Sequence, residues 1–178
     1  IATGDRWHTM ASITAAKAGK DIYCEKPCSM TIAESRALAD TVRREGRVYQ
    51  AGTQRRNVGN FVFAIGLAHS GKLGKLHTVH ANTLSPGTKL EWLPAEPEPA
   101  KDVCDWDMWL GQAPRRPYNS TLSPRGAHDH FPAWRAYREY SGGGHTDMGA
   151  HHYDIAQWAL DMDNSGPVEI IPPEKPDA

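Results

Sequence analysis

The residues best suited to catalysis lie late in the sequence, where Asp147 and His151 follow the glycine run 142–144. At this spacing the two side chains share one face of a helix, and Asp154 lies three residues further on. A carboxylate beside an imidazole fixes its tautomer and raises its basicity, which favours a general base near neutral pH. A glycine run also lets the backbone approach a ligand closely. The alternative, in which Asp147 only caps the helix and His151 is packed or solvated, stays open at this point.

Glu25-Lys26-Pro27 is a second candidate, because it directly follows a short predicted strand. An ammonium group at this place can hydrogen-bond a substrate hydroxyl and stabilise the alkoxide as it forms. A solvated turn is the plainer interpretation of the same three residues.

Five histidines gather toward the C-terminal half: His128, His130, His145, His151 and His152. Aspartates lie near them, which raises the possibility of a metal site. No pair shows the H-E-x-x-H spacing, so we expect no metal. Three aromatic residues precede the glycines, and they can stack on a sugar ring or pack into the core: Trp134, Tyr137 and Tyr140.

The elements that position these residues alternate in type through the first 52 residues. We predict a helix over 7–19, a strand over 21–24, a helix from Thr31 to about Gly46, and a strand over 47–52. Thr31 and Glu34 form a capping-box pattern at the start of the second helix. Strands alternating with helices indicate an α/β fold with a parallel sheet, and ligands bind beyond the carboxyl ends of such strands. Those ends are followed here by the polar segments 3–8, 25–27 and 53–56.

The pattern is weaker after residue 56. We predict a helix over 57–70, a longer strand over 76–84, a helix over about 145–160, and a strand-like run at 169–171. Between 85 and 132 the chain is rich in proline, and a short amphipathic helical turn at 106–110 interrupts it. We interpret this region as a long structured excursion of a second domain.

The composition excludes several classes of protein. The net charge is −1 without a basic stripe, so we expect no nucleic-acid partner. No apolar run approaches the roughly 20 residues that span a bilayer, so we expect no membrane partner. The cysteines number three and the nearest pair is spaced C-x3-C, which indicates free thiols. The chain lacks an initiator Met and opens on what looks like the end of a strand, so we expect a piece of a longer protein, with its localisation open.

Several longer stretches occur in a recognisable order: residues 3–8 (TGDRWH), 18–27 (AGKDIYCEKP), 71–76 (GKLGKL), 106–111 (WDMWLG) and 142–151 (GGGHTDMGAH). In this order they resemble the Gfo/Idh/MocA family, named for glucose-fructose oxidoreductase and inositol dehydrogenase. The resemblance implies the C-terminal part of a Rossmann-like NAD(P)-binding domain in 1–56. Part of an α/β domain with an open mixed sheet, for substrate binding and oligomerisation, then occupies 57–178. The family's G-x-G-x-x-G turn would precede Ile1, and the end of the second domain would follow Ala178.

The resemblance also implies roles for individual residues. Lys26, Asp147 and His151 match the catalytic positions, and the Lys26-Pro27 bond is expected to be cis. The positions that match cofactor contacts are Thr3, Trp7, His8, Glu25, Lys26, Gln54, Trp134 and Arg135. The last two resemble a Trp-Arg pair that reaches the cofactor from the second domain.

The activity implied is hydride transfer between NAD or NADP and a hydroxyl or keto group of a sugar, glycoside or polyol. His151 would act as base, Asp147 would hold it, and Lys26 would orient the hydroxyl. Two alternatives stay open: an NAD-retaining glycosidase or lyase that oxidises its sugar only transiently, and a non-catalytic fragment. We expect the complete protein to be a dimer or tetramer, and this chain without the glycine-rich turn to bind a dinucleotide poorly.

Overall fold

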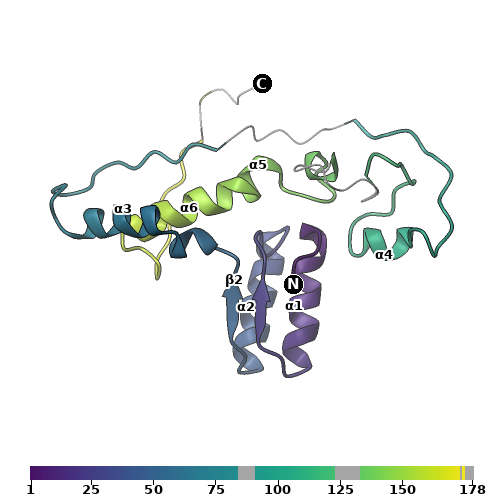
Figure 1. Ribbon diagram of the computed structural model, residues 1–178, viewed down its shortest axis with the longest axis horizontal. Helices are drawn as coiled ribbons and strands as arrows, with labels where there is room; N and C mark the ends of the chain where they lie inside the picture. The colour runs from purple at the N-terminus through teal and green to yellow at the C-terminus, as the bar shows by residue number, and fades with distance from the viewer. Residues whose placement is uncertain (84–90, 123–132, 173, 175–178) are drawn as a thin grey trace.

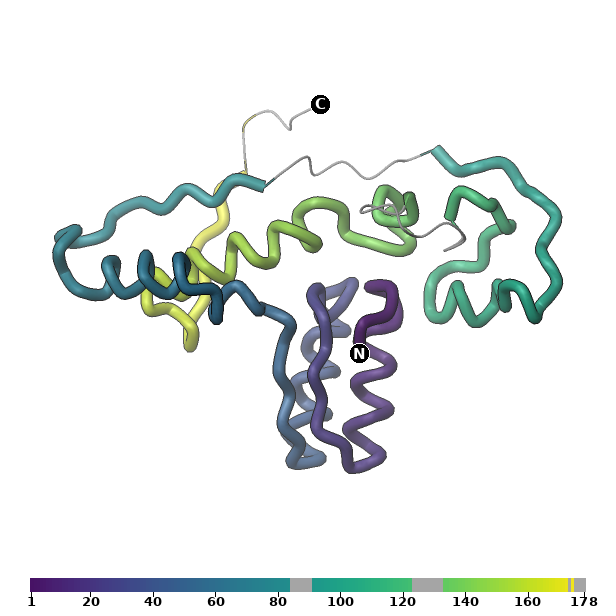
Figure 2. The backbone as a smooth tube through the Cα atoms, in the orientation of Figure 1, coloured from purple at the N-terminus to yellow at the C-terminus, as the bar shows by residue number. Residues whose placement is uncertain are grey.

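The computed structural model describes residues 1–83, 91–122, 133–172 and 174. The elements follow in this order: α1 (Asp5–Lys17), β1 (Ile22–Cys24), α2 (Ile32–Arg44), β2 (Tyr49–Ala51), the 3-10 helix η1 (Gln54–Asn57), α3 (Gly59–His69), α4 (Trp106–Leu110), the 3-10 helix η2 (Ala133–Ala136), α5 (Gly143–Thr146) and α6 (Met148–Ala159). Figure 1 shows an upright unit made of α1, β1, α2 and β2. A crossbar, made of α3 to α6 and the described segments between them, lies across the top of this unit. The chain passes from the upright unit to the crossbar through η1, as the tube in Figure 2 shows.

The upright unit is a parallel strand pair covered by helices, as the sequence predicts. β1 and β2 pair in parallel with Ile22 opposite Tyr49, and the backbone of Ile1 bonds to the other edge of β1. Ala16, Ile22 and Cys24 form the buried core between the strands and α1. Burying these apolar side chains stabilises the unit at roughly 25 cal/mol per Å². Both carboxyl ends of the strands face the crossbar.

The start of α2 confirms the predicted capping box. The Thr31 hydroxyl accepts from the Glu34 backbone N–H at 3.1 Å, and the Glu34 carboxylate accepts from the Thr31 N–H at 3.1 Å. Two backbone donors that a helix leaves without partners are satisfied in this way. The same carboxylate accepts from the Met30 N–H at 2.7 Å, which also orders the approach to the helix.

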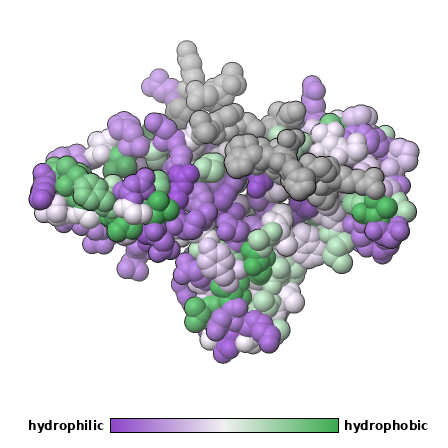
Figure 3. Space-filling view, in the orientation of Figure 1, coloured by the Kyte–Doolittle hydropathy of each residue, from purple (hydrophilic) through white to green (hydrophobic). Residues whose placement is uncertain are grey.

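Arg56 fixes α6 to the end of β2. Its guanidinium donates to Asp154 on α6 at 2.7 Å and to Asp163 beyond that helix at 2.7 Å. α3 packs beside α6 in this half of the crossbar (Figure 1). Several large apolar side chains stay on the surface here, with Phe63 of α3 75% exposed, and Figure 3 shows apolar surface at this end of the crossbar. In Figure 1, α6 begins above the ends of the strands.

An aromatic cluster forms the other half of the crossbar, from Trp106, Leu110, Tyr118, Leu122, Tyr137 and Tyr140. Tyr137 and Tyr140 are 3% and 0% exposed, so of the two predicted roles they take the core one, while Trp134 packs against them only partly buried. Arg6 of α1 joins this cluster to the upright unit. Its guanidinium lies 3.8 Å from the Trp109 ring centroid, and its Nε donates to the Trp109 carbonyl at 2.6 Å. Burial lowers the pKa of Arg6 to about 10.

A second link joins the same two parts. The Ser141 hydroxyl donates to the Asp5 carboxylate at 2.9 Å, and both residues are buried. Burial raises the pKa of Asp5, and the Ser141 hydrogen bond partly offsets this rise. The cluster is thus anchored to the N-terminal turn of α1 by both a cation and a carboxylate.

Three predicted elements differ in the structure. The single helix expected over 145–160 is broken at Asp147, which has φ −78° and ψ −86° between α5 and α6. The predicted strand over 76–84 is irregular in its described residues, 76–83, and so is the strand-like run 169–171. A strand needs a neighbour for its backbone N–H and C=O groups. Within the described ranges the sheet consists of β1 and β2 alone, so neither run has a partner.

Other expectations have mixed outcomes. The cysteines Cys24, Cys28 and Cys104 are free thiols, as predicted. None of the helices in the described ranges is long and apolar enough to cross a membrane. The domain boundary after residue 56 stays a prediction. Both ends of the predicted excursion, residues 85–90 and 123–132, lie outside the described residues.

Candidate active site

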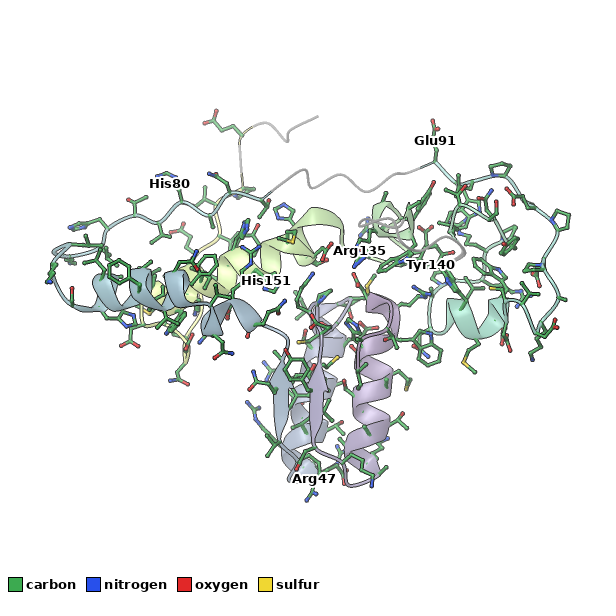
Figure 4. All side chains as sticks on the ribbon, viewed as in Figure 1. Arg47, His80, Glu91, Arg135, Tyr140 and His151 are labelled. Carbon is green, nitrogen blue, oxygen red and sulfur yellow. The ribbon has the colours of Figure 1, made fainter. Side chains whose placement is uncertain are left out.

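Lys26, Asp147 and Arg135 form an ion cluster where the upright unit meets the crossbar. The Lys26 ammonium donates to one carboxylate oxygen of Asp147, and the Arg135 Nε donates to the other at 3.1 Å. The Lys26 and Asp147 side chains are 14% and 12% exposed, and that of Arg135 is 31% exposed. Two cations thus share one carboxylate, which leaves the cluster with a net positive charge. Figure 4 shows Arg135 and His151 at this junction, with Arg47 at the far end of the upright unit.

The chain brings these residues together from three separate segments. Lys26 follows the carboxyl end of β1, and the Lys26-Pro27 peptide bond is cis, as the resemblance predicted. Arg135 belongs to η2 and comes from beside the aromatic cluster. Asp147 occupies the break between α5 and α6, where its N–H donates to the Gly143 carbonyl at 3.0 Å.

The glycines before Asp147 allow this tight turn. Gly143 has φ +67°, a backbone conformation that side chains with a Cβ rarely adopt. A Cβ on Gly142 would lie 2.4 Å from the side chain of Thr146. The Gly143 N–H donates to the Ser141 hydroxyl at 3.3 Å, so this donor is already bonded within the protein.

His151 lies one turn into α6 and is 3% exposed. Its Nδ1 is buried without a hydrogen-bond partner in the described part of the chain. Burial lowers the pKa of His151, and the positive charges of Lys26 and Arg55 lower it further. The imidazole is therefore neutral at neutral pH, with a nitrogen able to accept a proton.

The expectation that Asp147 holds His151 is wrong for this structure. Both carboxylate oxygens of Asp147 bond to cations, and no hydrogen bond joins it to His151. The physical reason is charge: two cations at the junction compete for the carboxylate more strongly than a neutral imidazole does. Asp147 also precedes α6, so the two side chains do not stack as on a continuous helix. Asp154, expected on the same face, bonds to Arg56 instead.

Four of the eight predicted cofactor contacts lie at the same edge of the sheet. Thr3 and Gln54 are exposed, and Glu25 is half-buried. Gly52 allows the close approach of Glu25, because a Cβ there would meet its carboxylate oxygen at 2.8 Å. Lys26 belongs to the ion cluster. These residues lie on consecutive strand ends, where a ligand of a parallel sheet is expected.

Three predicted contacts face other parts of the protein. His8 is 1% exposed, and its ring nitrogens lie 2.6 Å from the Pro27 carbonyl and 3.1 Å from the Thr3 carbonyl. His8 therefore fixes the backbone beside Lys26, and its predicted cofactor contact stays a prediction. Trp7 is half-buried and donates from Nε1 to the Met108 carbonyl at 3.0 Å. Trp134 is half-buried beside the aromatic cluster, and the Arg135 guanidinium lies 4.6 Å from its ring centroid.

Two interactions in the site were not predicted from the sequence. The Arg135–Asp147 bond joins residues 12 apart in an irregular segment, where no periodic spacing signals a contact. Arg55, whose charge reaches His151, follows β2 directly. Its position after a strand was the available signal.

The structure describes some, but not all, of the histidines considered for a metal site. Among the described residues, no group of three or more His, Cys, Asp or Glu side chains is arranged to hold a metal ion. His128 and His130 lie outside the described residues. His145 hydrogen-bonds to the Tyr153 hydroxyl at 2.6 Å, and the His152 Nδ1 bonds to the Asn82 carbonyl.

Comparison with known protein families finds two matching models. The oxidoreductase family's NAD-binding Rossmann fold matches residues 1–53, and its C-terminal alpha/beta domain matches residues 69–177. Levoglucosan dehydrogenase from Pseudarthrobacter phenanthrenivorans is 31% identical over 97 residues, which cover 52% of this chain and 25% of that protein. An inositol 2-dehydrogenase from Salmonella typhimurium is 27% identical over 93 residues, covering 52% of this chain and 28% of that protein.

Solved structures give the same fold over a longer span. Levoglucosan dehydrogenase in complex with NADH is 27% identical with a TM-score of 0.54, covering 89% of this chain and 33% of that one. The aldose-aldose oxidoreductase from Caulobacter crescentus, complexed with glycerol, has a TM-score of 0.57 at 23% identity, covering 89% and 36%. The fold is thus Rossmann-like, followed by an α/β domain. The chain covers about a third of these structures' length.

Proposed function

Because the chain belongs to the Gfo/Idh/MocA oxidoreductase family, we propose that it carries the reaction centre of a nicotinamide-dependent dehydrogenase. Its substrate is a CH–OH group of a sugar or polyol, or the matching keto group in the reverse direction. The observation that supports this proposal is the junction at the carboxyl ends of the strands, where Lys26 bonds to Asp147 and its charge lowers the pKa of the buried His151. The relatives named levoglucosan dehydrogenase and inositol 2-dehydrogenase support the substrate class.

His151 is the general base in this proposal. Its pKa is lowered by burial and by the neighbouring cations, so the imidazole is neutral and ready to take a hydroxyl proton at neutral pH. Its Nδ1 has no partner in the described structure, so that nitrogen is not already committed to another group. A positioned base of this kind contributes about 10² to 10⁴ in rate.

Lys26 orients the hydroxyl and stabilises the oxygen as it becomes negative. A cation fixed in advance at the developing charge needs no rearrangement during the reaction, which is why such groups are effective. Asp147 holds the Lys26 ammonium, and Arg135 holds Asp147 from the other side. We therefore assign Asp147 the role of positioning Lys26, in place of the imidazole contact expected from the sequence.

The residues at the strand ends fit the nicotinamide end of a dinucleotide. Thr3 and Gln54 are exposed there, Glu25 lies close to Gly52, and His151 has an uncommitted buried nitrogen. When bound, the nicotinamide ring supplies the hydride acceptor. The choice between NAD and NADP stays open in this proposal, although NADH complexes among the relatives favour NAD. The dimer or tetramer expected from the resemblance also stays a prediction.

Substrate screening tests the proposal directly. The protein is expressed from the longest reading frame that contains this sequence and is incubated with sugars and polyols plus NAD or NADP. We expect net cofactor reduction, lost in Lys26→Met and His151→Asn. It should be kept in Arg36→Gln, which changes an exposed side chain of α2. Release of an aglycone without net cofactor reduction would replace the dehydrogenase by the redox-neutral glycosidase or lyase.

A further inference from the structure

Arg55 is a cation at the proposed reaction centre that no carboxylate neutralises in the described structure. It follows β2 in η1, as Lys26 follows β1, so both lie at the same edge of the sheet. The adjacent Arg56 is bound by two aspartates. Arg55 forms no ion pair or hydrogen bond within the described residues, and its guanidinium lies 5.5 Å from the centroid of the Phe61 ring. Its charge is therefore available to a ligand.

A cavity of about 290 Å³ opens beside this guanidinium. It is lined by Arg55, Phe61, Asn82 and His152, together with apolar side chains of α6. No carboxylate belongs to this lining, and much of the wall is apolar. Small-molecule sites combine an apolar wall with a few fixed polar groups, and they begin at about 300 Å³, so this cavity suits a small ligand.

The cavity lies along α6, the helix that carries the proposed base. His152 lines it, and His151 precedes His152 on α6. The Nδ1 of His152 is bonded to the Asn82 carbonyl, so that nitrogen carries the proton. In the neutral ring the Nε2 is then an acceptor for a ligand hydroxyl. Arg55 also lies close enough to His151 to lower the pKa of that imidazole, which places the cation within electrostatic reach of the base.

We propose that Arg55 and the cavity beside it form a subsite for an anionic group on the substrate, and that this group is a carboxylate, so the substrate is a sugar acid. The guanidinium matches a carboxylate with two parallel hydrogen bonds. A single fixed cation suits one negative charge better than a phosphate monoester, which carries about −1.5 to −2 at neutral pH. The inference rests on the proposed function for the identity of the ligand as a sugar.

Matched substrates test this subsite. Rates are compared for glucose, glucuronate, the methyl ester of glucuronate and glucose 6-phosphate, and for the galactose series, with the protein from the longest reading frame. We expect kcat/KM for the uronate to exceed that for the neutral hexose and the ester about 10- to 100-fold. Arg55→Gln should bring the ratio of kcat/KM for the uronate to that for the neutral hexose close to one, whatever its effect on the absolute rates, while the exposed control Arg36→Gln should keep the preference.

Three results would overturn the subsite: equal rates for uronate and hexose, a preference that persists in Arg55→Gln, or a clear preference for the sugar phosphate. If no sugar is turned over, the proposed function fails. The subsite is then decided by equilibrium binding of glucuronate against its methyl ester. Selective uronate binding that disappears in Arg55→Gln would support it, and the lack of selectivity would overturn it.

Discussion

Removing the charge of Asp147 should destabilise the fold more than removing any exposed carboxylate. Asp147→Asn keeps the shape of the side chain but leaves Lys26 and Arg135 facing each other without a counter-ion. Removing one partner of a buried ion pair costs about 3–5 kcal/mol. Because the Arg135 side chain is 31% exposed and can rehydrate, we expect a value of about 3 kcal/mol, at the lower end of this range.

Urea unfolding followed by circular dichroism measures this cost. With a slope of about 2 kcal/mol per molar urea, the midpoint should fall by about 1.5 M. Asp107→Asn is the control, because Asp107 pairs with Arg115 on the surface, with side chains 86% and 69% exposed, and such pairs contribute about 0–1 kcal/mol.

The variants should also differ in how much stability they lose. Lys26→Gln leaves Asp147 paired with Arg135, so it should cost less than Asp147→Asn. The double variant Lys26→Gln/Asp147→Asn should recover part of the loss, since it removes one of the two stranded cations. A midpoint for Asp147→Asn equal to that of Asp107→Asn would refute the idea of a buried ion cluster.

Three further predictions concern His151, Gly111 and Thr31. The pKa of His151, followed by NMR of the imidazole, should lie below the usual value of about 6.5, because burial and neighbouring cations disfavour its charged form. The stability that His151 contributes is then complete above about pH 6.5, and it is lost as the pH falls through the pKa of His151 in the folded protein. A raised pKa would contradict this expectation. Gly111→Ala should destabilise the protein and change its tryptophan fluorescence. The reason is that Gly111 has φ +58° and that a Cβ there would lie 2.5 Å from the Trp7 ring. An unchanged spectrum and melting temperature would argue against that contact. Thr31→Ala should cost about 1 kcal/mol in thermal unfolding and Thr31→Ser much less, whereas equal losses would count against the capping box.

Local patterns predicted the upright unit well. The capping box at Thr31 and Glu34 and the alternation of helix and strand depend on residues close in sequence, and the structure has both. The predicted strand over 76–84 failed for a different reason. A strand is defined by its neighbour, and the described part of the chain supplies none beside residues 76–83.

The membership of the site stays a prediction, and the bonds that its residues form could not be predicted from the sequence. Lys26 bonds to Asp147, and its charge lowers the pKa of His151, although helical spacing suggested a carboxylate–imidazole pair. Spacing could not show that Asp147 breaks the helix, nor that Arg135 reaches it from an irregular segment. Competition between a neutral ring and two cations for one carboxylate is decided by tertiary structure, which a one-dimensional pattern does not contain.

Isotope transfer tests the central claim most directly. A sugar substrate deuterated at the carbinol carbon is incubated with NAD and the protein from the longest reading frame, and the nicotinamide product is examined by mass spectrometry. We predict that deuterium appears on the nicotinamide ring and that His151→Asn slows this transfer about 100-fold or more. A cofactor that gains no deuterium, or a His151→Asn protein that transfers it at the unmodified rate, would contradict the proposed reaction centre.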